Sequence, residues 1–205
     1  MNEQQLRQAE LRTDDAALLG DLSLIVLDLR SVIELCRRLS AEMAKPKEHQ
    51  DNQLIEGFWT AALVKYVRCF TTGKRFGLEP SVFAEFEGGV TTHQYFKNMR
   101  DKHVAHSVNP FGDVHVAALL PPASSEPQLV QGITVFSHKL LSTDQNGVKT
   151  LERLASVAHS YVVSQAKTVQ EAVLVWAKAQ PIESFAVGRI GMTAPGPEQA
   201  GIPRP

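Results

Sequence analysis

The chain has 205 residues, a formal net charge of -1 at pH 7 and 43% hydrophobic residues, which suits one folded domain with a sizeable core. No apolar run approaches the roughly 20 residues that a membrane helix needs, and the polar stretch "MNEQQLRQAELRTDD" lacks the apolar core of a signal peptide. The two cysteines, Cys36 and Cys69, lie far apart in helical patterns, so we expect a cytoplasmic protein with reduced, buried thiols rather than a disulfide.

The charge is unevenly distributed along the chain. Residues 59–107 contain seven basic and four acidic residues, a net charge of +3, which leaves about -4 for the remainder. Such a contrast permits an anionic partner, although most charge clusters only form a solvated face.

Residues 21–43 carry the clearest helical pattern. Apolar residues recur there at spacings of three and four, as on one buried face of a long helix: Leu22, Ile25, Leu29, Val32, Cys36, Leu39 and Met43. Pro46 predicts its end, because the residue before a proline avoids helical torsions. Residues 2–18 have fewer apolar positions and predict a weaker helix.

A second helix is predicted from a cap at Asp51 or Asn52 to Gly73. Its buried face would use Ile55, Phe58 or Trp59, Ala62, Tyr66 and Phe70, and its opposite face would show Lys65, Arg68 and Thr72. Pro80 then suits the first position of a short helical turn.

A third helix is predicted from about Thr92 to His106. Thr91 and Gln94 have the spacing of a capping box, in which the two side chains satisfy backbone N–H groups at the start of a helix. The apolar stripe runs through Phe96 and Met99 and continues to His103 and His106.

Beyond residue 113 the period changes. "VHVAALL" and "GITVFSHKLL" read as the strands of a hairpin at about 114–141, on which His115 and His138 would face each other. A long helix follows at about 148–179, with an inward face of Leu151, Leu154, Ala158, Val162, Val169, Val173 and Trp176. Residues 181–205 are rich in glycine and proline and predict a disordered tail.

These elements predict a mainly α fold. Helices with short connections favour an antiparallel helical bundle of four or more helices. The small β-hairpin would be an insertion before the last long helix, and residues 1–180 would form a single domain.

The segment "MRDKHVAHSVNPFGD", residues 99–113, concentrates groups suited to phosphate chemistry. Metal-free cleavage of RNA needs a base for the ribose 2'-hydroxyl, and histidine titrates near neutral pH. It also needs a cation beside the phosphate, and arginine offers a permanently charged fork. Arg100 and His106 supply one of each, but six residues on an ideal helix place them about 120° apart. The two would share a cleft only if the long Arg100 side chain reached round the helix, or if a second subunit completed the site.

The stretch "RDKHVAH", residues 100–106, resembles the Arg-x(4–6)-His signature of the HEPN superfamily (higher eukaryotes and prokaryotes nucleotide-binding domain). The wider context "FWTAALVKYVRCFTTGKRFGL…HQYFKNMRDKHVAHSVNPFGD" is similar to HEPN-like proteins of the abortive-infection type, over about residues 20–180. The resemblance implies a metal-independent endoribonuclease, a toxin or antiviral factor that acts as a homodimer on RNA, without a cofactor. A cognate antitoxin or regulatory protein is a possible further partner.

The resemblance also implies roles for individual residues. His106 would act as base or proton donor, Arg100 would steady the scissile phosphate, and Asp101 would orient the pair. Lys102 and His103 lie inside the motif, and Arg68 and Lys65 are candidate contacts to the RNA backbone; these four are candidate substrate-binding residues.

Structural readings compete with each of these roles. Arg100 and Lys102 near a helix C-terminus would complement the helix dipole, at about 1 kcal/mol or less each. His103 continues the apolar stripe and suits the core, while Lys65 and Arg68 suit a solvated face. We expect no metal site, because zinc would want further ligands beside His103 and His106. A non-catalytic helical binding or regulatory module therefore remains the alternative function.

Overall fold

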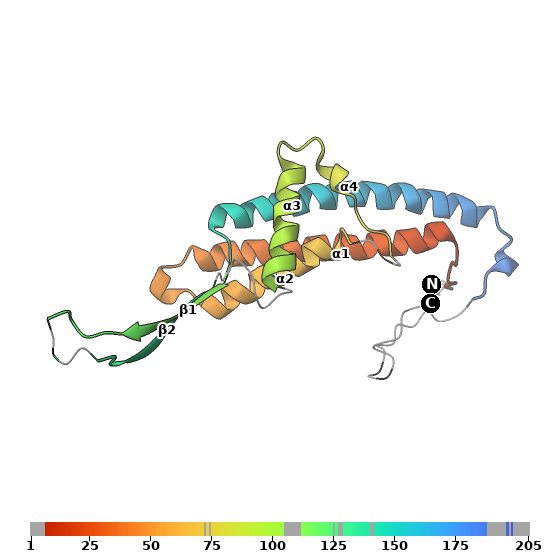
Figure 1. Ribbon diagram of the computed structural model, residues 1–205. Coiled ribbons are helices and arrows are strands. Elements are labelled where there is room, and N and C mark those ends of the chain that lie inside the picture. The colour runs from red at the N-terminus through yellow and green to blue at the C-terminus, as the bar shows by residue number, and fades with distance from the viewer. Residues whose placement is uncertain are drawn as a thin grey trace.

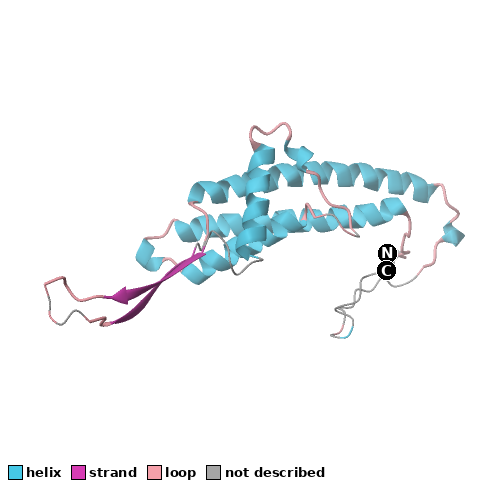
Figure 2. Cartoon of the chain, in the orientation of Figure 1, coloured by secondary structure: helices cyan, strands magenta, loops and turns pink. Residues whose placement is uncertain are grey.

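The computed structural model describes residues 7–71, 73, 75–104, 112–124, 126, 129–139, 142–187, 196 and 198. Its α-helices are α1 (Asp14–Met43), α2 (Asn52–Arg68), α3 (Gly89–Met99) and α4 (Gln145–Lys178), and its strands are β1 (Gly112–Leu119) and β2 (Gly132–Lys139). The predicted mainly α fold, with a hairpin before the last long helix, is confirmed (Figure 2).

The helices α1, α2 and α4 run alongside one another, with α1 antiparallel to the other two (Figure 1). The helix α3 lies across them (Figure 1). The core fills the space between these helices, and its largest fully buried side chains include Trp59, Tyr66, Phe83, Phe96 and Leu29. The hairpin projects from one end of the bundle, opposite the end at which α1 begins and α4 ends (Figure 1).

The stripe predicted for α1 is buried as expected. Leu22, Ile25, Leu29, Val32, Cys36 and Leu39 all lie in the core, and Met43 packs against it. The helix begins earlier than predicted, because Thr13 accepts a hydrogen bond from the Ala16 amide at 3.1 Å and so caps the helix. Of the weak helix predicted for residues 2–18, residues 7–13 are not helical, and residues 1–6 lie outside the described residues.

A buried carboxylate joins α1 to α2. Glu42 accepts hydrogen bonds from Lys45 Nζ at 2.6 Å and from the Asp51 amide at 2.9 Å. Asp51 in turn caps α2 by accepting from the amides of Gln53 and Leu54, as its sequence position predicted. These bonds fix the turn by which the chain reverses direction.

The helix α2 ends at Arg68 rather than at Gly73. Its buried face uses Trp59 and not Phe58, together with Ile55, Ala62, Leu63, Tyr66 and Val67. The predicted turn at Pro80 is present as a 3-10 helix, Pro80–Phe83.

The capping box predicted for α3 is wrong. The helix starts at Gly89, after Gly88 adopts a left-handed conformation with φ 68°, which glycine reaches at low cost because it has no Cβ. Gly89 lies so close to the short helix before it that an added Cβ would come within 2.9 Å of Phe83 Cβ. The close contact between these segments therefore sets the start of α3, ahead of the Thr91–Gln94 pair.

The last helix and the hairpin differ from prediction in two details. Trp176 is 41% exposed rather than inward, because it lies near the C-terminal end of α4. His115 pairs with Phe136 and not with His138, which stands opposite Asp113 in the strand register. In the region predicted as a tail, Ile182–Ser184 form a 3-10 turn and Val187 forms a β-bridge with Ala9.

Candidate functional site

The helix that carries the candidate motif is anchored through its aromatic face. Phe96 and Met99 are each 1% exposed, and the Phe96 ring meets the edge of Trp59 with centroids 6.0 Å apart. Arg100 follows Met99 directly. The packing of α3 on α2 therefore fixes the position from which the Arg100 side chain leaves the helix.

A buried histidine forms the second anchor of α3. His93 is 1% exposed, and its Nδ1 shares a hydrogen bond with Tyr66 Oη at 3.0 Å. Its ring lies 4.3 Å from that of Phe70 between centroids. Burial, with a smaller contribution from the charge of Lys97, lowers the pKa of His93 below its ordinary value of 6.5.

The sequence predicts Tyr66 on the buried face of α2 but assigns no role to His93. His93 precedes Phe96 by three residues, so the apolar stripe of α3 can be extended backwards to it. That spacing marks His93 as buried. The hydrogen bond to Tyr66 could not be read from it, because the two residues lie 27 positions apart.

The stability of the protein is predicted to fall when His93 is protonated. Because its pKa is lowered in the folded state, the unfolded chain binds the proton more readily. Stability is then fully present above about pH 6.5 and declines as the pH falls through the lower pKa of the folded state. The free energy of unfolding in urea, measured between pH 8 and pH 5, should show this loss.

The variant His93→Gln is the control for this titration. It removes the imidazole while keeping polar atoms that can bond to Tyr66. The slope of the free energy of unfolding against pH should therefore become smaller above pH 5. The carboxyl pKa values of Glu34 and Glu42 are lowered, first of all by hydrogen bonds from Arg38 and Lys45, so both titrate at more acidic pH. An unchanged slope in His93→Gln would contradict the prediction.

The motif begins at a change in helix type. Residues Arg100–Val104 form a π-helical turn directly after α3, so the hydrogen bonds there run from residue i to i+5 instead of i+4. The predicted helix is thus helical through residue 104, but not uniformly α-helical. Single π-helical turns inside helices are found frequently at functional sites.

Asp101 joins two cations of this turn. Its Oδ1 lies 3.0 Å from Arg100 Nη1, and its Oδ2 lies 3.3 Å from Lys97 Nζ. The Arg100 side chain is 26% exposed, and Lys102 is exposed. One carboxylate among three basic residues leaves this turn with net positive charge, and the guanidinium is held in place while it remains accessible.

The second residue of the Arg100–His106 pair cannot be located in the structure. His106 lies outside the described residues, and so does the side chain of His103. The predicted convergence of Arg100 with His106, and the predicted packing of His103, therefore stay predictions.

The side chains of Lys65 and Arg68 pair with an aspartate of α1 and are not grouped with Arg100. Both pair with Asp28 of α1: Arg68 Nε donates to Asp28 Oδ2 at 2.9 Å, and Lys65 Nζ lies 3.5 Å from Asp28 Oδ1. The hydrogen bond with Asp28 raises the pKa of Arg68. The structure thus groups Arg100 with Asp101, and separately groups Arg68 and Lys65 with Asp28.

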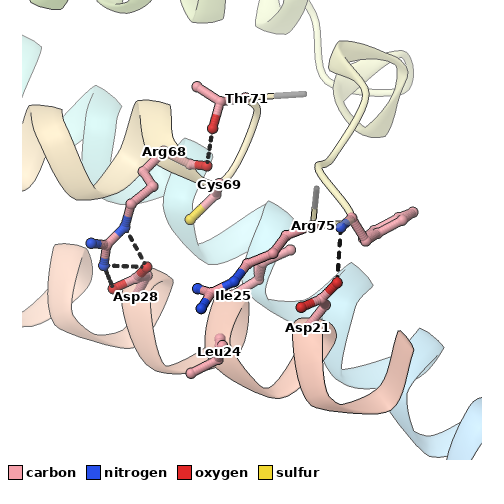
Figure 3. A pocket seen from close by; sticks show the side chains of 9 residues that line it. Asp21, Leu24, Ile25, Asp28, Arg68, Cys69, Thr71 and Arg75 are labelled. Carbon is pink, nitrogen blue, oxygen red and sulfur yellow. Dashed lines mark hydrogen bonds and ion pairs between the residues drawn. The ribbon is translucent and has the colours of Figure 1, made fainter. Parts of the chain in front are cut away.

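A small pocket of about 190 Å³ lies beside the Arg68–Asp28 pair. Figure 3 shows Arg75 extending beside Ile25 in the space between Asp28 and Asp21. Asp21 Oδ2 also accepts a hydrogen bond from the Phe76 amide at 2.9 Å. Two arginines and two aspartates balance in charge here, so this pocket offers less attraction to an anion than the Arg100 turn.

The thiols lie where the sequence predicted. Cys36 and Cys69 are free and buried, and burial raises the pKa of each thiol to about 12. Both are therefore protonated at neutral pH and lack the thiolate that a cysteine nucleophile needs.

Among the residues that the structure describes, no group of three or more His, Cys, Asp or Glu side chains could hold a metal ion. No helix in the described part of the chain has the length and apolar character needed to cross a membrane.

Comparisons with protein-family models, with curated proteins and with solved structures give no match for this chain. The resemblance to the HEPN superfamily therefore depends on the residues of the motif and its sequence context.

Proposed function

We propose that the protein is a metal-independent endoribonuclease of the HEPN type, related to toxins or phage-defence factors. One observation carries the proposal: Arg100, in a π-helical turn, has an accessible guanidinium held by Asp101. The catalytic residues are His106 and Arg100, with Asp101 in the orienting role.

The chemistry assigns a separate task to each group. The imidazole of His106 takes the proton from the ribose 2'-hydroxyl, whose oxygen then attacks the adjacent phosphorus. The bond to the 5'-oxygen of the next nucleotide breaks, and that oxygen takes a proton from water and leaves as a 5'-hydroxyl, while the other fragment ends in a 2',3'-cyclic phosphate. Arg100 stabilises the charge that develops on the phosphate oxygens. Asp101 Oδ1 lies 3.0 Å from Arg100 Nη1, and a guanidinium has five N–H donors, more than this one carboxylate can accept, so donors remain for two phosphate oxygens.

The site is proposed to be shared by two protomers of a cytoplasmic homodimer. A second copy supplies the partner group that the spacing of Arg100 and His106 does not bring together on one α-helix. Lys102, exposed on the same turn, and His103 are proposed as contacts to neighbouring nucleotides. Lys65 and Arg68 become weaker candidates, because Asp28 already binds both.

The test is purified protein with end-labelled RNA in EDTA. We expect fragments that end in a 2',3'-cyclic phosphate, and we expect them to be absent with His106→Ala. The matched control is His49→Ala, because His49 is an exposed histidine outside the motif. RNA that stays intact across structured and single-stranded substrates would contradict the proposal.

A non-catalytic binding module is the second candidate function. The observation that favours it is the pairing of Arg68 and Lys65 with Asp28, which offsets one of their two positive charges and so reduces the basic surface free for RNA. Expression in a host cell separates the two candidates. Growth arrest that His106→Ala relieves favours the nuclease, whereas normal growth with both chains favours the binding module.

A further inference from the structure

Lys97 lies in the last turn of α3, outside the motif of residues 100–106. Its Nζ is 3.3 Å from Asp101 Oδ2, because residues four apart lie on the same side of a helix. The Lys97 side chain is 40% exposed, so the packing of α3 on the core does not account for this contact.

The carboxylate of Asp101 is shared between Lys97 and the proposed catalytic arginine. Its Oδ2 lies near Lys97 Nζ, whereas its Oδ1 lies 3.0 Å from Arg100 Nη1. Consecutive side chains on a helix do not face each other, so Arg100 has to turn sideways to reach Asp101. The direction of that turn is set by where the carboxylate is held.

A single ion pair would hold the carboxylate poorly. The terminal torsion of an aspartate side chain is broad, and one contact on one oxygen leaves the plane of the carboxylate free to rotate. Contacts on both oxygens remove that freedom. Lys97 therefore supplies the second contact that defines the orientation of Asp101, and with it the position of Arg100 Nη1.

The backbone of Arg100 is fixed independently of this contact. Its amide donates to the carbonyl oxygens of Phe96 and Lys97 at the end of α3. The remaining freedom lies in the long arginine side chain, which loses rotamer entropy when it is ordered. Electrostatic stabilisation of a transition state needs donors that are already oriented before the charge develops.

We propose that Lys97 is a positioning residue for Arg100 and acts through Asp101. This inference rests on the proposed nuclease function and deepens it, because it names a residue outside the motif that orients the guanidinium. Ion pairs between exposed side chains contribute little to folding. The loss of Lys97 should therefore lower the rate of cleavage and leave the stability of the protein nearly unchanged.

Single-turnover cleavage of end-labelled RNA tests the proposal. Lys97→Gln removes the charge that holds Asp101, and we expect it to lower the rate by about three- to fivefold, as for an exposed ion pair. Lys97→Arg keeps a cation within reach of Asp101 and should restore most of the rate. Urea denaturation should give the same midpoint for both variants and the wild type.

Two controls separate positioning from general effects. Gln94→Ala removes another contact between residues four apart on α3, the 2.8 Å hydrogen bond from Gln94 Nε2 to Asn98 Oδ1, without touching Asp101. Lys178→Gln removes one positive charge at an exposed lysine near the end of α4. Each should change the cleavage rate by less than about twofold.

A double-mutant cycle shows whether Lys97 acts through Asp101. In a chain that already carries Asp101→Ala, the further change Lys97→Gln should lower the rate by less than about twofold, because the contact it removes is absent. An equal three- to fivefold loss with and without Asp101 would overturn the proposal, since Lys97 would then contact the RNA itself.

A readout that needs no cleavage is the order parameter of the Arg100 Nε–H group, measured by NMR relaxation. It should fall in Lys97→Gln and keep its wild-type value in Lys97→Arg. An unchanged order parameter in Lys97→Gln would overturn the positioning role, whether or not RNA is cleaved. Absence of cleavage by the wild type would instead contradict the proposed function, and the order parameter alone would then decide the role of Lys97.

Discussion

Replacing Phe96 by alanine is expected to lower the free energy of unfolding by about 3–5 kcal/mol, as for other buried aromatic residues. Phe96 is 1% exposed and meets the edges of both Trp59 and Tyr66. Its loss leaves a cavity between α3 and α2, and the rigid helices on either side cannot close it fully. Urea denaturation followed by far-UV circular dichroism measures the change.

The neighbouring residue provides the control. Tyr95 lies on the same helix but is 48% exposed, so Tyr95→Ala should cost about 1 kcal/mol, mainly for its ring contact with Phe96. Equal losses in the two variants would mean that α3 is not anchored through Phe96. Because Arg100 follows Phe96 by one helical turn, the Phe96 variant should also lose RNA cleavage.

The largest functional effect is expected from Arg100. If this guanidinium stabilises the charge on the phosphate, Arg100→Gln should lower the single-turnover rate of RNA cleavage by about 10²- to 10³-fold. Arg100→Lys should recover part of the rate, since it keeps the charge but loses the planar fork. The rate is measured with saturating protein over end-labelled RNA.

The matched control for Arg100 is Arg30→Gln, at an exposed arginine of α1. It removes the same charge from the protein and should leave the cleavage rate unchanged. The variant Arg100→Gln should unfold at nearly the wild-type urea concentration, because its side chain is partly exposed. Cleavage at the wild-type rate by a folded Arg100→Gln protein would remove Arg100 from the site.

The sequence alone determined the helices and the hairpin. Helix stripes and strand alternation are local patterns with periods of 3.6 and 2 residues, so the buried faces of α1, α2 and α4 could be predicted before any contact was known. The cap at Asp51 could also be predicted, because its partners are the next amides along the chain. The motif of residues 100–106 could also be recognised in the sequence, because its residues follow one another along the chain.

The tertiary structure decided which polar groups meet. Arg68 and Asp28 lie 40 residues apart, and Tyr66 and His93 lie 27 apart, so no local period indicates either pair. Close packing against the preceding short helix, with Gly88 in a left-handed conformation, placed the start of α3. The exposure of Val116 and Phe136, on opposite faces of the hairpin, also follows from how the whole chain packs, because alternation predicts that a strand has two faces but not which face the core covers.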